Sequence, residues 1–342
     1  MDEQVRQQIG PAPQGGRAVT IDDVARLAGV HRSTVSRALS RPDLVREETR
    51  RRIQGAVEML GYRTNLVARS LSVGRSGLLA LLVPDCANLY FAEFVKSAQE
   101  CAAEHEVSII VASTGRNHGT EVRLVRSLVS HVDGVVAVSP RSPASALRAA
   151  IPGCPLVSVG ADGVPGIDVL LSNREISRLA LDHLLALGHR HIAVIEGPVD
   201  FHSTDQRRSE TTAWASEHPE VRLTVLQAGE NVRDGFAAAD VVADLRDNGV
   251  TAVTTYCDAV AFGLLMRLVA RRIRVPDELS LVGADDVELA SFLPGGLTSI
   301  SLGVRQLGRV AVEAVLGITP VDRASVPVPT IVVRGTTGPA RL

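Results

Sequence analysis

Short apolar runs alternate with amphipathic segments from residue 78 onward, and this alternation leaves few folds open to the chain. The runs are LLALLV (78–83), VSIIVA (107–112), GVVAV (134–138), PLVSV (155–159), IAVIE (192–196), LTVLQ (223–227), TAVTTY (251–256) and LSLVGAD (279–285). Helical spacing between them appears at 91–104, 119–131, 174–187, 234–248 and 258–271. Nearly continuous apolar strands alternating with helices are typical of parallel sheets covered on both faces. The length fits two doubly wound α/β units, with crossovers near 160–172 and 285–304.

The formal net charge of -2 conceals a strong asymmetry along the chain. Residues 17–75 carry twelve Arg and six acidic residues, a net charge of +6, whereas residues 76–342 carry a net charge of -7. The first part is therefore a compact basic module joined to an acidic body. Such an asymmetry favours a polyanionic partner for the module.

The basic module has the pattern of a helix-turn-helix. Thr20 is a good N-cap for a first helix, which Gly29 ends, and a second helix starts only a few residues later. Val35, Ala38 and Leu39 face inward from that second helix. A third amphipathic helix runs from about Glu47 to Leu60, buries Ile53, Val57 and Leu60, and stops at Gly61. Two short helices around a glycine-containing turn match the DNA-binding motif.

The second helix exposes a cluster of hydrogen-bond donors on its first turn and outer face. They are Arg32, Ser33, Thr34, Ser36 and Arg37. In helix-turn-helix proteins this end enters the major groove, where such donors reach base edges and phosphates. The alternative is a solvated helical bundle or a protein-interaction module. Arg50–Arg52, at the start of the third helix, are expected to meet phosphates or solvent.

The segment NLVARSLSVGRSG, residues 65–77, has helical spacing but no core of its own. A helix this short is marginal in water unless something packs on it. It is either an interdomain linker or a hinge that folds on DNA. In the second case Arg69 meets phosphates and Leu71 enters the minor groove as an apolar wedge.

Polar and aromatic side chains follow several predicted strands and suggest a binding pocket. Ligands in doubly wound folds lie beyond the carboxyl ends of strands, and here also between the two units. The candidates are Asp85, Asn88, Tyr90, Phe91, His202, Asp205, Arg207, Arg208, Asp258, Asp285 and Asp286. For the carboxylates, a helix cap or a solvated loop is the alternative. For Tyr90 and Phe91, the alternative is a place in the core.

Other classes of protein find little support. The common nucleophile, phosphate-loop, dinucleotide and zinc-protease motifs are absent, so we expect neither enzymatic activity nor a cofactor. The four cysteines are widely spaced, which favours reduced thiols, and no Cys/His spacing matches a zinc site. His183, His189 and His191 are expected to cap a helix end. Without a signal peptide or a membrane span, we expect a cytoplasmic protein with a disordered leader at 1–17.

Over residues 19–335 the chain resembles the lactose-repressor (LacI/GalR) family of bacterial transcription regulators. The motifs that carry the resemblance are TIDDVARLAGVHRSTVSRALS, EETRRRIQGAVEMLGY, NLVARSL, LLVPD, HLLALGHRHIAVIEGP and VPDELSLVGADD with LTSI. The resemblance implies a body like the periplasmic binding proteins, in two lobes with a small-molecule effector between them. It also implies a homodimer whose two headpieces bind a palindromic operator in double-stranded DNA.

The resemblance also assigns roles to single residues. Base-reading positions fall on Arg32, Ser33 and Arg37, backbone-contacting positions on Thr20 and Asn65, and the hinge leucine on Leu71. Effector-contacting positions fall on Asn88, Tyr90, Phe91, Arg207 and Asp285. The sensor departs from the family pattern. Gly160 stands where several sugar-responsive relatives carry an acid, Ala284 replaces the usual Tyr, and the segment after Arg207 lacks the common Gly-Phe element.

These inferences together predict a helix-turn-helix domain at 18–63, a hinge at 64–76 and an effector-binding and dimerisation domain at 77–337. Lobe 1 is expected over about 77–160 plus 304–337, and lobe 2 over about 173–285. The predicted function is a DNA-binding transcriptional regulator, controlled by a small molecule such as a sugar or nucleoside. The alternatives are a regulator with a degenerate, non-sensing cleft and a two-lobed solute-binding protein.

Overall fold

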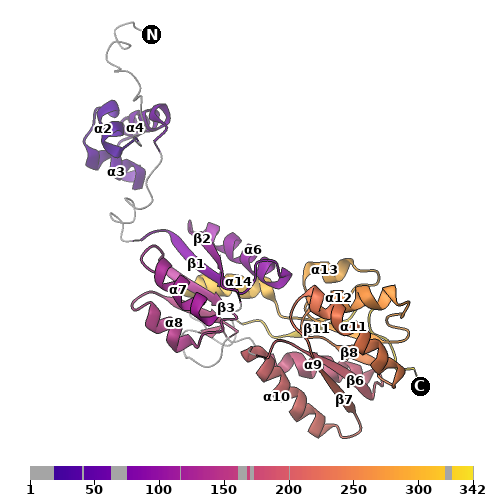
Figure 1. The fold of residues 1–342 in the computed structure, drawn as a ribbon. Helices are drawn as coiled ribbons and strands as arrows, with labels where there is room; N and C mark the ends of the chain where they lie inside the picture. The colour runs from indigo at the N-terminus through magenta and orange to yellow at the C-terminus, as the bar shows by residue number, and fades with distance from the viewer. Residues whose placement is uncertain are drawn as a thin grey trace. The chain divides into compact units, whose positions relative to one another are not determined.

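The computed structural model forms two compact units, Met1–Ser76 and Gly77–Leu342 (Figure 1). The structure describes residues 19–40, 42–62, 75–115, 117–160, 168–169, 173–199, 201–319 and 326–341. The expected leader and most of the expected hinge, including Asn65, Arg69 and Leu71, lie outside the described residues.

The N-terminal unit is a small helical bundle with the predicted helix-turn-helix. Its elements are α2 (Ile21–Ala28), α3 (Arg32–Ser40), the 3-10 turn η1 (Pro42–Leu44) and α4 (Glu47–Leu60). The Asp23 carboxylate accepts hydrogen bonds from the Thr20 N–H at 3.0 Å and the Thr20 hydroxyl at 2.7 Å, which fixes the start of α2. Gly29 and Gly61 adopt left-handed conformations that end α2 and α4.

The core of this bundle is small and apolar. Val24, Val35 and Ile53 are buried, one from each helix, and Ala56 joins them. Val57 and Leu60, predicted to be buried, are half-buried at the edge of the same cluster.

Lobe 1 of the second unit is a five-stranded parallel sheet of order β2-β1-β3-β4-β5. Its elements are β1 (Leu78–Val83), α6 (Leu89–Glu104), β2 (Ser108–Ser113), α7 (His118–Leu128), β3 (Gly134–Val138), α8 (Ala144–Ala150), β4 (Leu156–Val159) and β5 (Asp168–Val169). The central strands β1, β3 and β4 are almost entirely buried, as their apolar sequences require.

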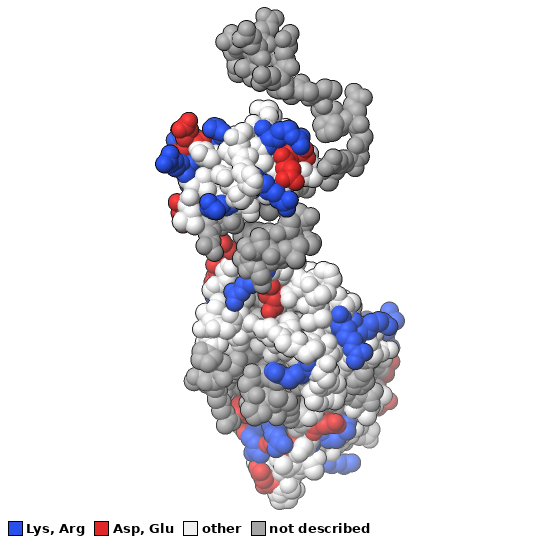
Figure 2. Space-filling model, turned by 90° about the vertical axis from the view of Figure 1, so that its left-hand side faces the viewer, with Lys and Arg blue, Asp and Glu red and all other residues white. Residues whose placement is uncertain are grey.

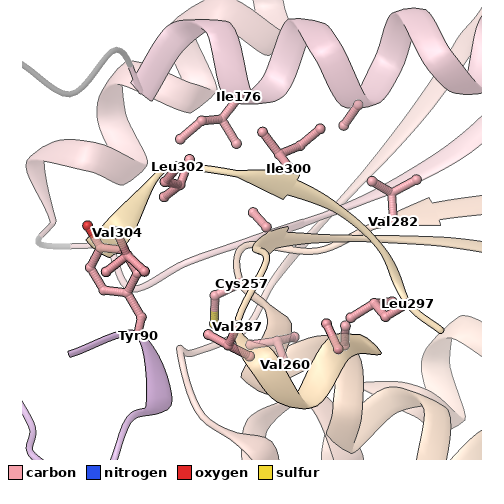
Figure 3. Packing of buried hydrophobic residues seen from close by; sticks show 14 of the residues in the cluster. Tyr90, Ile176, Cys257, Val260, Val282, Val287, Leu297, Ile300, Leu302 and Val304 are labelled. Atoms are coloured by element: carbon pink, nitrogen blue, oxygen red, sulfur yellow. The ribbon is translucent and has the colours of Figure 1, made fainter. Parts of the chain in front are cut away.

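Lobe 2 is a six-stranded sheet of order β11-β10-β9-β8-β6-β7. Its elements are α9 (Asn173–Ala186), β6 (His191–Glu196), α10 (His202–Glu217), β7 (Arg222–Gln227), α11 (Val232–Asp247), β8 (Ala252–Thr254), α12 (Asp258–Ala270), β9 (Ser280–Asp285), α13 (Glu288–Phe292), β10 (Thr298–Ser301) and β11 (Thr330–Val332). All neighbouring strands are parallel except β11, which runs antiparallel to β10. Apolar side chains from the helices and strands pack together in its core, and Val260, Val287 and Leu297 form one such group (Figure 3).

The end of the chain is shared between the lobes. α14 (Val304–Val315) packs against α6 and the sheet of lobe 1, but β11 pairs with β10 in lobe 2. We expected residues 304–337 to lie in lobe 1 throughout. The difference arises because the short run TIV adds to the free edge of β10, a pairing that leaves little trace in local sequence. The chain therefore passes between the lobes three times.

Helices α11 and α12 of lobe 2 approach each other closely through two glycines. A Cβ atom at Gly235 would lie 2.0 Å from the Val260 carbonyl oxygen. A Cβ atom at Gly263 would lie 1.9 Å from the Val232 carbonyl oxygen. Only glycine at both positions allows the two backbones to touch in this way.

The side chains of the three histidines near the end of α9 do not cap that helix, so the predicted role of these rings was wrong, although the His189 backbone N–H donates to the Leu184 carbonyl oxygen at 3.1 Å. His183 hydrogen-bonds Thr337, and His191 hydrogen-bonds Thr224, each at 3.0 Å. The buried ring of His189 contacts the Thr251 and Ser280 hydroxyls and the Gly338 carbonyl oxygen at 2.8–3.1 Å. The contacts of His183 and His189 tie the C-terminal segment to lobe 2. The side chain that caps the helix end is the Arg190 guanidinium, which donates to the Leu185 carbonyl oxygen at 3.2 Å.

Among the residues that the structure describes, no helix has both the length and the apolar character to cross a membrane. The four cysteines are free thiols, and Cys101 and Cys257 are buried.

Candidate functional site

The outer face of α3 carries the donors expected to meet DNA. Arg32 is exposed and forms a long ion pair with Asp22, at 3.7 Å. Arg37 is also exposed, whereas Thr34 and Ser36 are half-buried. The Ser33 hydroxyl lies 2.9 Å from His31 Nδ1 at the start of the helix. Long, exposed guanidinium groups on the first two turns of a second helix suit recognition of guanine edges and phosphates.

The three consecutive arginines of α4 divide into two kinds. Arg50 and Arg51 both pair with Glu47 on the surface of α4. The Arg52 Nη2 donates to the carbonyl oxygens of Ala28 at 2.6 Å and Gly29 at 3.2 Å, at the end of α2. Arg52 therefore fixes the turn that leads into α3, a role that the sequence did not suggest. On the face of the helical unit that Figure 2 shows, basic side chains, interspersed with acidic ones, lie around the edge of an area without charged residues.

A pocket in the second unit draws residues from both lobes. It is lined by Asn88, Tyr90, Phe91, Ser139, Asn173, Phe201, Ser203, Arg207, Glu230, Tyr256, Cys257, Asp285 and Leu302. Five of these were expected from the sequence: Asn88, Tyr90, Phe91, Arg207 and Asp285. They come from the start of α6, the second turn of α10 and the end of β9, three places far apart in the chain.

Aromatic rings are concentrated in this pocket. The whole chain has six Phe, three Tyr and one Trp, and four of these ten rings line it. The rings of Tyr90 and Phe91 meet edge to face, with centroids 5.2 Å apart. Phe201 and Tyr256 belong to lobe 2. Rings from both lobes give the pocket flat apolar surfaces that suit the face of a planar or ring-shaped ligand.

Arg207 is held in place from two sides. Its guanidinium lies over the Tyr256 ring, 4.6 Å from the centroid, and its Nη1 donates to the Tyr256 carbonyl oxygen. The Tyr256 hydroxyl is itself hydrogen-bonded to Ser203 at 2.7 Å. Arg207 Nε is buried and has no hydrogen-bond partner among the described residues. The pocket thus contains a positioned cation with an unused donor.

Asp285 supplies a buried acid on a strained turn. Its φ angle is 112° and that of Asp286 is 54°, values that non-glycine residues rarely adopt and that occur often at ligand sites. Burial raises the pKa of Asp285 well above its usual range, the neighbouring Asp258 raises it further, and Arg207 acts against both. The protonated form of this buried carboxyl group is therefore favoured relative to that of an exposed aspartate.

Two predicted effector residues, Asp85 and Asp258, do not line this pocket. Asp85 is exposed and accepts a hydrogen bond from the Ala87 N–H at 2.9 Å in its own turn. The Asp258 carboxylate is buried at the start of α12. It accepts from the Ser299 hydroxyl at 2.7 Å and the Val287 N–H at 3.0 Å. Burial raises the pKa of Asp258 to about 7, although both hydrogen bonds lower it. Asp258 anchors the turn after Asp285.

The other pocket residues were not predicted from the sequence: Ser139, Asn173, Phe201, Ser203, Glu230, Tyr256, Cys257 and Leu302. Tyr256 gave a usable signal, since it ends the predicted strand TAVTTY directly before Cys257 and Asp258. Ser139 likewise follows the predicted strand GVVAV. Asn173 and Glu230 begin or precede helices, where a capping role is the more common explanation.

Comparison with known proteins identifies the two units. The model of the lacI family of bacterial regulatory proteins matches residues 20–65, and that of the periplasmic binding protein-like domain matches residues 181–337. The regulator pepR1 of Lactobacillus delbrueckii subsp. lactis is 30% identical over 299 residues, covering 86% of this chain and 89% of the relative. The chain belongs to the lacI family.

Other members support the same assignment for this lacI-family regulator. The ribose operon repressor of Escherichia coli K12 is 28% identical over 319 residues, which cover 87% of this chain and 92% of that protein. The lac repressor dimer bound to operator and an anti-inducer has a similar structure. Its TM-score is 0.82 at 26% identity, covering 94% of this chain and all of that one. The predicted headpiece, the two-lobed α/β body and the function as a DNA-binding transcriptional regulator are confirmed.

Proposed function

We propose that this regulator is a cytoplasmic, non-enzymatic repressor that binds a palindromic operator as a homodimer and responds to a small molecule between its lobes. The observation that carries the proposal is the convergence of five sequence-predicted effector residues on one pocket. Asn88, Tyr90 and Phe91 come from lobe 1, and Arg207 and Asp285 come from lobe 2.

DNA recognition is assigned to residues 18–63 together with a hinge at 64–76. Arg32, Ser33, Thr34, Ser36 and Arg37 of α3 face the major groove, and Thr20 contacts the DNA backbone. Two headpieces related by the dimer axis place their α3 helices in major grooves about one helical turn, or a multiple of it, apart. On sequence grounds alone, Asn65 and Arg69 contact the backbone and Leu71 opens the minor groove between the half-sites.

The effector is a sugar or a nucleoside. Both offer a flat ring face and an edge of hydroxyl or ring-nitrogen atoms. The four aromatic rings suit the face, while Arg207, Asp285 and the amide of Asn173 suit the edge. The Asn173 amide donates to Gln206 at 2.8 Å, which orients it beside the pocket. The name of the ribose operon repressor agrees with this class.

Effector control follows from the construction of the pocket from both lobes. A ligand that contacts both lobes binds one arrangement of them more tightly than another. It thereby shifts the population of the arrangement that holds the operator. By linkage, operator and effector change each other's affinity by the same factor.

Arg37→Ala tests the assignment of α3. We expect operator binding to weaken by about 1–3 kcal/mol and the preference at one base pair to relax, because a donor to base edges is lost. Titrations of the full chain on operator and on random DNA of equal length measure both effects. Equal losses on the two DNAs would show that Arg37 contacts phosphate only.

Thermal-shift screening against sugars, nucleosides and small acids tests the pocket. A ligand at a concentration about 100 times its Kd stabilises the protein by about 2.7 kcal/mol. We expect Asp285→Ala to abolish the shift and Asp85→Ala, outside the pocket, to retain it. If no compound in these classes shifts the melting temperature, the cleft does not sense these classes.

A further inference from the structure

The end of α6 and the last turn of α14 bring three metal-ligating side chains together in lobe 1. They are Cys101, His105 and Glu313. The thiol sulfur, an imidazole nitrogen and a carboxylate oxygen all lie within 4.8 Å of one another. Among the residues that the structure describes, no other group of three or more cysteine, histidine or carboxylate side chains converges in this way.

The two helices position these ligands for different reasons. Cys101 lies in the last turn of α6 and His105 is the residue that follows this helix, so the two are four residues apart and share one face. α14 packs against α6 (Figure 1) and brings Glu313 to the same face. No zinc spacing is visible in the sequence because this third ligand comes from late in the chain.

The types of ligand and their separations suit a zinc ion. Sulfur and imidazole ligands favour borderline-soft ions such as Zn²⁺, whereas Ca²⁺ and Mg²⁺ prefer oxygen alone. In a tetrahedral zinc site the ligands lie about 2.0–2.3 Å from the ion, and hence about 3.3–3.8 Å from one another. Cys101 is buried, but His105 is exposed and Glu313 is half-buried, so rotation of these two side chains can bring their ligand atoms to that spacing.

Arg309 lies beside the three ligands. Its guanidinium donates to both carboxylate oxygens of Glu104 at 2.7 Å, which balances its charge on the side away from the group. Its Nη1 also lies 3.9 Å from the Cys101 sulfur and 3.6 Å from a carboxylate oxygen of Glu313. Two carboxylates and a thiolate then face one guanidinium, and a divalent cation balances the excess negative charge. Arg309 thus acts as an outer-shell partner that orients two of the ligands.

We propose that Cys101, His105 and Glu313 form a zinc-binding site that fastens α14 to α6, with water as the fourth ligand. The thiol proton is released to solvent when the ion binds. Tyr90, in the pocket between the lobes, lies about 16 Å from Cys101 along the axis of α6. The ion therefore stabilises lobe 1 without contact with the ligand of that pocket.

Cobalt titration of the untagged full chain, freed of metal by a chelator and kept in a non-thiol reductant, tests the thiolate ligand. Co²⁺ occupies zinc sites, and its bond to a thiolate gives a charge-transfer band in the near-ultraviolet. We expect this band to saturate at a single Co²⁺ per chain and to disappear on addition of Zn²⁺ but not of Mg²⁺. Cys101→Ser should abolish the band. Cys86→Ser, the control at an exposed thiol outside the group, should retain it.

Competition with a chromophoric chelator measures the affinity for Zn²⁺ and tests the other two ligands. His105→Ala and Glu313→Gln should each weaken zinc binding about 100-fold or more, since loss of an outer-shell partner alone costs about 10–100-fold. His131→Ala, at an exposed histidine outside the group, should bind zinc as wild type does. Zinc should also raise the melting temperature of wild type but not of Cys101→Ser.

The proposal is overturned if wild type shows no thiolate band, if the band survives Cys101→Ser, or if His105→Ala and Glu313→Gln both bind zinc as tightly as wild type. If Cys101→Ser does not fold, the last comparison decides alone, because replacement of the exposed His105 spares the core. Operator binding is measured separately on each variant, so failure of the zinc site leaves the proposed function standing.

Discussion

Replacement of Arg52 by Met separates a structural role for this arginine from a DNA-binding one. Arg52 Nη2 donates two charge-assisted hydrogen bonds to the last carbonyls of α2, at 2.6 and 3.2 Å. Hydrogen bonds from charged groups to a helix C-terminus contribute about 1–2 kcal/mol at a partly exposed site. Met keeps the length of the aliphatic stem but removes these donors. We therefore expect the headpiece to lose about 1–2 kcal/mol of stability.

Hydrogen exchange of the full chain, measured on peptides from α2 to α4, reports this loss directly. A change of about 1–2 kcal/mol accelerates exchange about fivefold to thirtyfold, while peptides from the body serve as an internal reference. Arg51→Met is the matched control. Arg51 is 78% exposed and pairs with Glu47 on the surface, so its loss should leave exchange nearly unchanged.

The salt dependence of operator binding tests the alternative, that Arg52 contacts a DNA phosphate. An arginine that neutralises a DNA phosphate contributes about 0.9 to the slope of log affinity against log salt. We expect Arg52→Met to leave that slope unchanged, because its guanidinium is occupied within the headpiece. A slope reduced by about one, with normal exchange in α2, would refute the structural role.

Two further changes test lobe 2. Burial lowers the pKa of His189, so the folded state keeps the ring neutral while the unfolded state takes up a proton below about pH 6.5. The free energy of unfolding of wild type should therefore fall relative to His189→Gln between about pH 7 and pH 5, and parallel urea-unfolding curves would contradict this. Gly263→Ala should destabilise the body by about 1–3 kcal/mol in thermal unfolding, since its Cβ atom would lie 1.9 Å from the Val232 carbonyl oxygen. Gly55→Ala is the control, because nothing lies within 4 Å of a Cβ there and alanine favours the helix by about 0.5–1 kcal/mol.

The sequence predicted those features that depend on local pattern. Capping residues and helical spacing placed α2 and α4, and Gly29 and Gly61 end them as expected. Apolar runs placed the central strands of both sheets. The edge strand β11 was not predicted. Its formation depends on pairing with β10, some thirty residues earlier in the chain, and not on its own composition.

The candidate pocket was predictable where a residue type implied its chemistry. Asp285 ends a predicted strand, Arg207 lies in the segment after another, and both carry charge, so they could be identified from the sequence. Phe201 and Ser203 did not, because ordinary loop and helix-start residues become pocket residues only through the packing of α10. Asp258 misled for the opposite reason. Its carboxylate accepts a hydrogen bond from the Val287 N–H and so holds a turn. The sequence alone does not distinguish this structural role from ligand binding.

The placement of α14 has a consequence for the order in which a newly made chain matures. Lobe 1 begins at Leu78 but is completed by Val304–Val315, which cover α6. During synthesis the headpiece, complete at Leu60, can fold long before α14 leaves the ribosome. Until then the apolar face of α6 stays uncovered. Only a polypeptide synthesised past Val315 can therefore assemble lobe 1 of the body.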